Sequence, residues 1–207
     1  MRGILLFILI GVLLSACEVQ SSKTNPFSKL PILGEKDING TDTVFHTIPD
    51  FTFTNQYGEA ITPATFQDAI YFVDYFFTSC PTICPKVKEQ ELRIFDKYKD
   101  RKDIYMLSVS VDPTYDTVER LAWYADKLEI PKSNWHLVTG DKDFIYEVAD
   151  DFFHIAQEDP DAPGGFNHDG RLILIDKQKR IRSFCDGLKE KDVDRFMGDI
   201  EKLLNEK

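Results

Sequence analysis

Two cysteines four residues apart, Cys80 and Cys84, lie where a predicted strand gives way to a predicted helix, and this junction constrains the fold most. The strand is predicted over residues 70–77, a largely apolar run rich in β-branched and aromatic side chains. After Pro85 a helical pattern begins, with apolar residues at Val87, Leu92, Phe95 and Tyr98. Open α/β sheets place their functional sites at the carboxyl end of such a strand.

The spacing of the two cysteines predicts a paired site. Four residues bring both sulfurs to one side of a helical turn, close enough for a disulfide or for two bonds to one metal ion. A helix N-terminus lowers the pKa of a thiol, because its unpaired N–H groups and its dipole favour the thiolate. The alternative is a pair of small hydrophobic residues in a core, which the bracketing prolines at this junction disfavour.

Strands and helices alternate after this junction. Further buried strands are predicted over residues 104–111 and 135–139, and a helical pattern follows each of them. Asp116 and Glu119 have the spacing of a capping pair at the start of the first of these helices. Hairpins are predicted at two places and an amphipathic helix at the C-terminus: residues 50–62, residues 171–185 and residues 193–204. The predicted fold class is α/β: a central mixed sheet with an N-terminal hairpin, a C-terminal antiparallel hairpin and helices on both faces.

The N-terminus has the features of a targeting segment. An apolar run over residues 4–14 follows a basic residue and is too short to span a bilayer as a mature helix. The small residues before Cys17 resemble the lipobox of bacterial lipoproteins, whose cysteine becomes lipidated. We therefore expect a signal peptide over residues 1–16, a lipidated Cys17 with a polar tether up to residue 28, and one domain over residues 29–207. A plain secretory signal is the alternative.

Either signal places the domain outside the cytoplasm, facing the periplasm or another extracytoplasmic space, where disulfides persist. The formal net charge of −10, without a stripe of clustered Lys and Arg, argues against nucleic acid as a partner. Four cysteines do not suggest a disulfide scaffold. Cys185 has no obvious partner and is predicted to be a buried bystander.

One of the four histidines lies in a position suited to the cysteine site. His46, His136 and His154 are expected to have structural or surface roles. His168 lies in a Gly- and Asp-containing loop, residues 164–170, immediately before the C-terminal hairpin. An imidazole beside two thiolates would complete a Cys2His set suited to copper or zinc. On its own, a loop histidine is more often a surface residue.

Three stretches together resemble the Sco/SenC family: residues 74–85, residues 108–117, and His168 ahead of residues 172–176. The resemblance runs from about Val44 to the C-terminus. It implies a thioredoxin-like fold and a role in maturing the dinuclear copper centre of cytochrome c oxidase.

The resemblance also implies the ligands and one partner. One copper ion, Cu(I) or Cu(II), would be held by Cys80, Cys84 and His168. The resemblance implies the copper-centre subunit of the oxidase as a partner. The oxidising space outside the cytoplasm implies a thioredoxin-like reductant for the cysteines, and the lipobox implies the membrane through the lipid anchor. The family usually has Asp before this histidine and Ser after it, whereas this chain has Asn167 and Asp169. That difference leaves open what holds the other nitrogen of the imidazole.

A carboxyl group in the central strand suggests proton exchange. Asp74 lies six residues before Cys80 in an otherwise apolar strand, and thioredoxins resemble this, with a buried acid at the same offset. Burial raises the pKa of a carboxyl, which can then exchange a proton with a nearby thiol. The alternative is a hydrogen-bonded structural Asp.

Two functions from different classes are compatible with the sequence. The first is copper delivery, in which oxidation of Cys80 and Cys84 to a disulfide would switch copper capture off. The second is an enzyme, a thiol–disulfide oxidoreductase that reduces cysteines of an oxidase subunit. His168 separates the two, because dithiol exchange does not need it. A peroxidase is a distant third, since a dithiol plus histidine exceeds what peroxide reduction requires.

Overall fold

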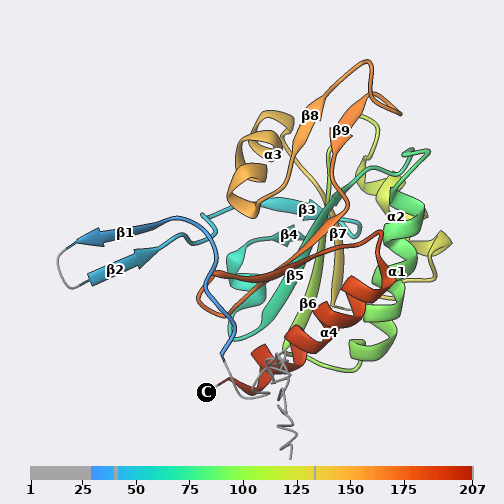
Figure 1. Cartoon of the computed structure of the whole chain (residues 1–207). Helices are drawn as coiled ribbons and strands as arrows, with labels where there is room; N and C mark the ends of the chain where they lie inside the picture. The colour runs from blue at the N-terminus through green and yellow to red at the C-terminus, as the bar shows by residue number, and fades with distance from the viewer. Residues whose placement is uncertain (1–28, 40–41, 133, 207) are drawn as a thin grey trace, which may run out of the picture.

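The computed structural model describes residues 29–39, 42–132 and 134–206. Seven of its strands form one sheet in the order β11-β10-β5-β6-β7-β3-β4 (Figure 1). The three central strands run parallel, as predicted: β5 (Ile70–Phe76), β6 (Ile104–Ser110) and β7 (Trp135–Thr139). All seven residues of β5 are buried, as expected for a strand whose faces are both covered.

Antiparallel strands flank the parallel centre on both sides. β10 (Arg171–Ile175) pairs with β5 and with β11 (Ile181–Asp186). On the other side, β3 (Phe53–Asn55) pairs with β7 and with β4 (Ala60–Ile61). Both predicted hairpins, and with them the predicted mixed sheet, are confirmed.

Helices pack on the face of the sheet to which Phe72, Asp74 and Phe76 point. Phe72 meets the ring of Phe196 edge-on, with 5.9 Å between ring centroids, and Phe76 stacks on Tyr124 at 5.8 Å. The helices on this side are α1 (Cys84–Tyr98), α2 (Val118–Lys127) and α4 (Glu190–Asn205). Apolar residues of these helices, among them Val87, Leu121 and Phe196, belong to the hydrophobic core.

The opposite face of β5 is covered by shorter elements. Tyr71 stacks on Phe66 with 4.3 Å between centroids, and Tyr75 packs against Phe152 at 6.3 Å. The covering elements are η1 (Pro63–Phe66), α3 (Lys142–Ala149) and η2 (Asp150–Phe152). Helical elements thus lie on both faces, as predicted (Figure 1).

The predicted capping pair of α2 is wrong. The helix begins at Val118, and the Thr117 hydroxyl caps it by accepting the N–H of Arg120 at 3.3 Å. Asp116 is fully buried and bonds to residues outside the helix. The carboxylate is used there because buried N–H and O–H donors need an acceptor more than the exposed helix end does.

Two further hairpins were not predicted. They are β1 (Lys36–Asn39) with β2 (Asp42–Phe45), and β8 (Ala156–Glu158) with β9 (Phe166–His168). Figure 1 shows both extending away from the body. The expectation that His168 lies in a loop is therefore corrected: it ends a paired strand.

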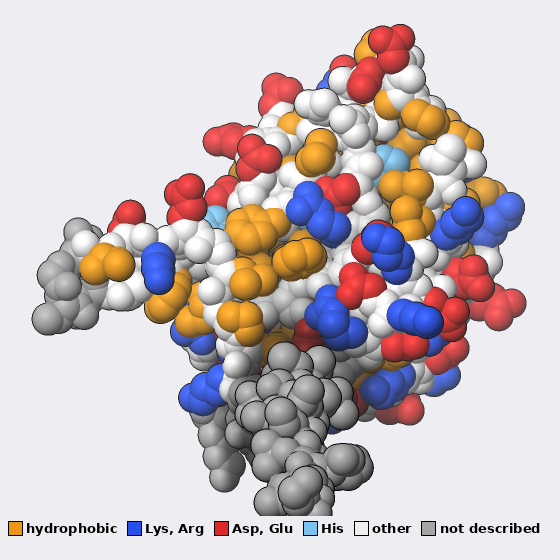
Figure 2. All heavy atoms as spheres, viewed as in Figure 1, with side chains coloured by type: hydrophobic (Ala, Val, Ile, Leu, Met, Phe, Trp, Pro, Cys, Tyr) orange, Lys and Arg blue, Asp and Glu red, His pale blue; other side chains and the backbone are white. Residues whose placement is uncertain are grey.

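Charged side chains of both signs are interspersed over the α1 and α4 side of the molecule (Figure 2). Several form ion pairs between the two helices, including Arg93 with Asp194 at 2.6 Å and Lys97 with Glu201 at 3.1 Å. Such exposed pairs contribute little to stability, and each is worth less than about 1 kcal/mol.

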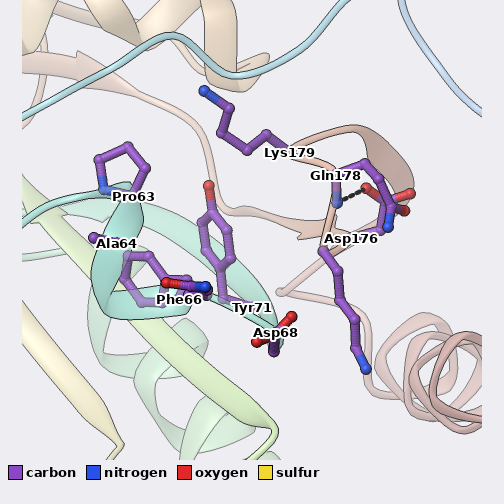
Figure 3. A pocket seen from close by; sticks show the side chains of 10 residues that line it. Pro63, Ala64, Phe66, Asp68, Tyr71, Asp176, Gln178 and Lys179 are labelled. Carbon is purple, nitrogen blue, oxygen red and sulfur yellow. Dashed lines mark hydrogen bonds between the residues drawn. The ribbon is translucent and has the colours of Figure 1, made fainter.

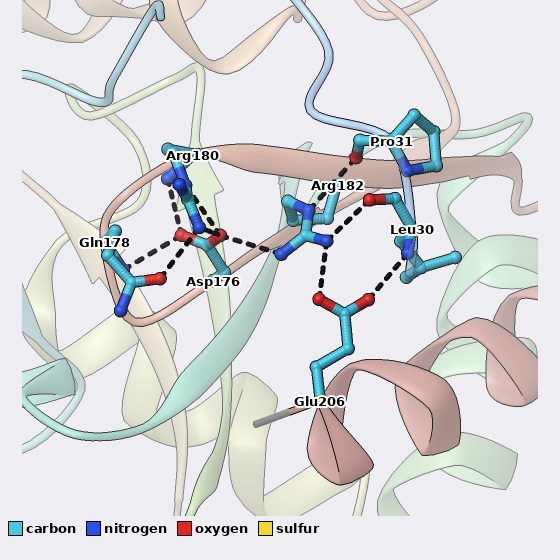
Figure 4. A network of polar contacts seen from close by, with 7 residues as sticks. All are labelled: Leu30, Pro31, Asp176, Gln178, Arg180, Arg182 and Glu206. Carbon is cyan, nitrogen blue, oxygen red and sulfur yellow. Dashed lines mark hydrogen bonds and ion pairs between the residues drawn. The ribbon is translucent and has the colours of Figure 1, made fainter. Parts of the chain in front are cut away.

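A buried guanidinium joins three parts of the chain at the end of β5 opposite the cysteines (Figure 4). Arg182, 5% exposed, donates to Asp176 at 3.0 Å, to Glu206 at 2.7 Å, and to the carbonyls of Leu30 at 2.6 Å and Pro31 at 3.0 Å. The network fixes the start of the described chain against β11 and the end of α4.

The expected signal peptide, lipidated Cys17 and tether lie outside the described residues. No helix in the described part of the chain has the length and apolarity needed to cross a membrane.

We predict that Arg182→Met lowers the free energy of unfolding by about 3 kcal/mol, because the carbonyls of Leu30 and Pro31 and the Glu206 carboxylate lose this donor, and the buried Asp176 carboxylate loses one of its cationic partners. Arg180→Met is the matched control: Arg180 pairs with the same carboxylate but is partly exposed, so its loss should cost about 1 kcal/mol or less. Urea denaturation measures both. Equal losses of unfolding free energy in the two variants would show that the buried guanidinium stabilises the fold no more than the partly exposed one does.

Candidate metal centre

Three side chains from separate elements converge at the carboxyl end of β5. Cys80 lies in the loop after β5, Cys84 is the first residue of α1, and His168 ends β9. The Nε2 atom of His168 is 3.2 Å from the Cys84 sulfur and 3.7 Å from the Cys80 sulfur. All three donor atoms lie within 4.8 Å of one another, and this is the one such cluster found among the described residues.

The arrangement fits a single soft metal ion. Donors bonded to one ion at about 2.0–2.3 Å lie about 3–4.5 Å apart, so small side-chain adjustments suffice. Both cysteines are free and buried, and the histidine is partly buried. Two thiols and one imidazole form a set that suits copper, with zinc as the chemical competitor.

The loop that carries Cys80 is held by a buried carboxylate. Asp116 accepts the Thr78 N–H at 3.0 Å, the Thr78 hydroxyl at 2.5 Å and the Ser110 hydroxyl at 2.6 Å. Arg120 in turn donates to the Thr78 hydroxyl oxygen at 2.9 Å. Asp116 therefore connects the loop after β5 to the end of β6. Its contact in that loop, Thr78, lies two residues before Cys80.

The two thiols differ in their tendency to ionise. A hydrogen bond from the Cys84 thiol, helped by one from the His168 ring, lowers the pKa of Cys80 to about 3 despite burial. The same bond, together with burial, raises the pKa of Cys84 far above its ordinary value. The pair therefore shares one proton, with Cys80 as the thiolate.

Aromatic packing fixes the His168 ring. Phe77 meets it edge-on with 5.0 Å between ring centroids, and Phe166 packs on Phe77 at 5.1 Å. Gly164 lies directly over Phe77 at a φ of +84°, where a Cβ atom would come within 2.8 Å of the ring. The Nδ1 atom of His168 is buried and has no hydrogen-bond partner among the described residues.

The carboxylate next to this histidine bonds elsewhere. Asp169 accepts hydrogen bonds from His154 at 3.1 Å and from the Arg171 side chain at 2.7 Å. Burial alone would raise the pKa of Asp169, but these bonds outweigh it and hold that pKa well below its ordinary range. Neither Asn167 nor Asp169, the two neighbours that differ from the expected pattern, therefore bonds to the Nδ1 atom of His168.

A buried charge cluster lies behind Cys84. Asp74 is 2% exposed and lines a narrow void together with Cys84 and His168. Its carboxylate accepts a hydrogen bond from Lys88 at 2.8 Å, and the Lys88 ammonium is also 2.8 Å from Glu91. Asp74 is buried beside the cysteine site, as expected, but it has a cationic partner. Its role as proton acceptor stays a prediction.

Sequence reasoning missed Lys88 and Glu91, although the signal was present. The helical period that turns Val87 and Ile94 inward turns these two charged residues inward as well. Burial, and then the charge of Asp74, raise the pKa of Glu91 well above its ordinary value. Burial would lower the pKa of Lys88, but the two carboxyl groups outweigh it and raise that pKa.

The remaining histidines and Cys185 lie outside the cluster of donors. His46 bonds through Nε2 to the Asp151 carbonyl at 2.8 Å, and His136 lies 3.3 Å from Asn55. Both have structural contacts, as expected. Cys185 is free and fully buried, and burial raises the pKa of its thiol, which disfavours the reactive thiolate form.

A separate pocket of about 300 Å³ lies at the opposite end of β5, between η1 and the β10–β11 turn (Figure 3). Tyr71 and Phe66 form one wall, and residues of the turn, among them Gln178 and Lys179, form another. None of its lining residues is a cysteine or a histidine. It therefore lacks the donors that distinguish the metal site.

Comparison with known proteins identifies relatives of the whole domain. A family model described as SCO1/SenC matches residues 39–205. The crystal structure of a SCO1/SenC family lipoprotein from Bacillus anthracis is 26% identical, with a TM-score of 0.69, covering 77% of this chain and 95% of that one.

Two further solved structures share the fold. BsSco, a member of the Sco family of cytochrome c oxidase assembly proteins in which a disulfide switch was identified, is 24% identical, with a TM-score of 0.68 and coverage of 78% and 95%. Arabidopsis thaliana ScoI with copper bound is 22% identical, with a TM-score of 0.63 and coverage of 76% and 98%. The expected thioredoxin-like fold is confirmed by these likenesses.

We predict that Cys80 reacts first with iodoacetamide and keeps reacting at pH 6, where an ordinary thiol is less than about 1% ionised. Cys84→Ala removes the hydrogen bond that contributes most to this effect, so it should move the reactivity midpoint to higher pH. Peptide mass spectrometry after timed labelling identifies the modified residue. First labelling at Cys84 would reverse the assignment.

We predict that Glu91→Gln gains stability over the wild type as pH rises. The folded pKa of Glu91 lies above its unfolded value of about 4.3, so ionisation of Glu91 opposes folding increasingly above that pH. The gap in unfolding free energy should widen by about 1 kcal/mol per pH unit from pH 4.5 until the folded pKa is reached. Glu89→Gln, an exposed change on the same helix, is the control. A gap that stays constant between pH 4 and pH 8 would contradict the assignment.

Proposed function

Because the chain belongs to the SCO1/SenC family, we propose that it is a copper chaperone that holds copper on Cys80, Cys84 and His168 and delivers it to the dinuclear copper centre of cytochrome c oxidase. The observation that carries this proposal is the convergence of two sulfurs and one imidazole nitrogen within 4.8 Å. Copper is the cargo in this proposal.

The electrostatics of the thiols support metal capture near neutral pH. A metal-binding thiol must first lose its proton, and Cys80 has already lost it. Cys84 keeps one proton, because the hydrogen bond to Cys80 and burial raise its pKa, and the nearby Lys88 ammonium offsets only part of that rise. The metal would have to displace this proton. The soft donor set favours Cu(I) and also accommodates Cu(II).

We propose further that the domain faces an extracytoplasmic space as a lipoprotein anchored through Cys17. The support is the sequence of the N-terminus and the likeness to a family lipoprotein. In such an oxidising space Cys80 and Cys84 can form a disulfide, which has no thiolate to bind a metal. An external thioredoxin-like reductant would therefore act before each loading.

A thiol–disulfide oxidoreductase is the second candidate, favoured by one observation. The low pKa of Cys80 beside a protonated Cys84 is the arrangement of an attacking thiolate and a resolving thiol. The client in that case would be the cysteines of an oxidase subunit. Neither step needs His168, which therefore separates the two functions.

We predict that the reduced full-length chain binds one copper per molecule, and that Cys80→Ser and Cys84→Ser each abolish tight binding. His168→Ala should weaken binding by at least about 100-fold, since losing a ligand costs at least as much as losing a residue that orients one. His46→Ala is the matched control and should leave the affinity unchanged. Cu(I) competition titration measures each affinity.

An additional arm uses the air-oxidised chain, which should not bind copper. Full copper retention by His168→Ala would remove the histidine from the site. Retained dithiol exchange together with absent copper binding in the wild type would leave the oxidoreductase as the function.

A further inference from the structure

The carboxylate of Asp169 has all its acceptor positions filled. Its Oδ1 atom accepts the Arg171 N–H at 3.0 Å and lies 3.1 Å from Nδ1 of His154. Its Oδ2 atom accepts the Ile155 N–H at 3.1 Å and the Arg171 guanidinium at 2.7 Å. Two donors come from Arg171 at the start of β10, and the other two come from the segment just before β8. Asp169 therefore closes the base of the β8–β9 hairpin.

The hairpin needs such a closure because its strands pair with each other and with no other strand among the described residues. In that pairing Ala156 lies opposite His168, at the end nearest the body. No sheet hydrogen bond therefore fixes the imidazole relative to Cys80 and Cys84. The position of the hairpin on the body must come from its base and from side-chain packing.

The base is anchored to the strand that leads to the cysteines. The His154 ring is fully buried, with Nδ1 facing Asp169 and Nε2 3.3 Å from the Val73 carbonyl on β5. It also packs against Tyr75 of β5, with 4.8 Å between ring centroids. One path of contacts thus runs from β5 through His154 and Asp169 to His168.

We propose that Asp169 and His154 are positioning residues of the metal centre, holding the β8–β9 hairpin so that Nε2 of His168 meets the two sulfurs. This inference rests on the proposed copper-binding function. A ligating imidazole is commonly oriented by a hydrogen bond to its second nitrogen, and here that nitrogen has no partner among the described residues. The orientation is instead imposed through the backbone on one side and through Phe77 on the other.

The test is the Cu(I) affinity of Asp169→Asn in the reduced full-length chain. The amide nitrogen of Asn cannot accept hydrogen bonds. In Asp169→Asn it replaces one of the two carboxylate oxygens, so the donors that face that position lose their acceptor. We expect binding to weaken about 10- to 100-fold, as for residues that orient a metal ligand. The Cu(II) spectrum should lose its nitrogen-ligand signature, as we also expect for His168→Ala. The reduction potential of the Cys80–Cys84 pair should stay at the wild-type value.

Two comparisons distinguish positioning from general damage. Asp176→Asn alters a carboxylate at the other end of β10 that is just as fully bonded, so it should lower the melting temperature without weakening copper binding by more than about twofold. In a double-mutant cycle, Asp169→Asn should cause no further loss of affinity in the His168→Ala background, because it acts through that histidine. His154→Phe can keep the ring contact with Tyr75 but loses the polar contacts with Asp169 and the Val73 carbonyl. Its copper affinity serves as the test if Asp169→Asn does not fold.

The inference is overturned if the wild type binds copper and either the Asp169→Asn or the His154→Phe chain binds it equally well. It is also overturned if Asp176→Asn weakens binding as much as Asp169→Asn does, since affinity would then follow overall stability. Failure of the wild type to bind copper would instead contradict the proposed function, and the positioning role would fall with it.

Discussion

The position of every donor in the metal centre depends on β5, which is buried on both faces and hydrogen-bonded along both edges. Its carboxyl end carries the loop with Cys80, and the buried Asp116 carboxylate ties that loop to the end of β6. The ring of His154, which lies at the base of the hairpin, has its Nε2 atom 3.3 Å from the backbone carbonyl of Val73 on β5. A rigid strand thus serves as the common reference for elements that do not otherwise share a sheet.

The proposed ligand set consists of two parts that different elements hold in place. Cys80 and Cys84 are four residues apart and share a proton, so the thiolate of Cys80 is stabilised mainly by its neighbour Cys84, with a smaller contribution from the His168 ring. His168 lies on a separate hairpin, where its ring contacts Phe77, and we propose that Asp169 and His154 position that hairpin. Dithiol chemistry needs the first part, and metal binding at full strength needs both. A single site can therefore support two chemistries whose requirements differ by one side chain.

The central strands, the closing helix and the paired cysteines could be predicted because apolar periodicity and residue spacing are local signals. The β8–β9 hairpin could not be predicted, because its short strands are largely polar. Phe77, which packs against it, is distant in sequence, and no local pattern indicates that Asp169 bonds to His154 and Ile155. Asp116 resembled a helix cap because a capping pattern says nothing about competing buried donors. Lys88 and Glu91 lay on the inward face of α1, but charged residues are usually assigned to the surface.

The two sulfurs and the imidazole nitrogen are separated very differently along the chain, and this has a consequence for the order of folding. Closing a loop of four residues is entropically cheap, so the two cysteines can meet in a chain that has barely begun to fold. The imidazole, 84 residues beyond Cys84, joins them only after β10 has found its place beside β5. A complete three-donor site is therefore a marker of a finished domain, whereas the dithiol alone is already available to oxidants and metals during maturation.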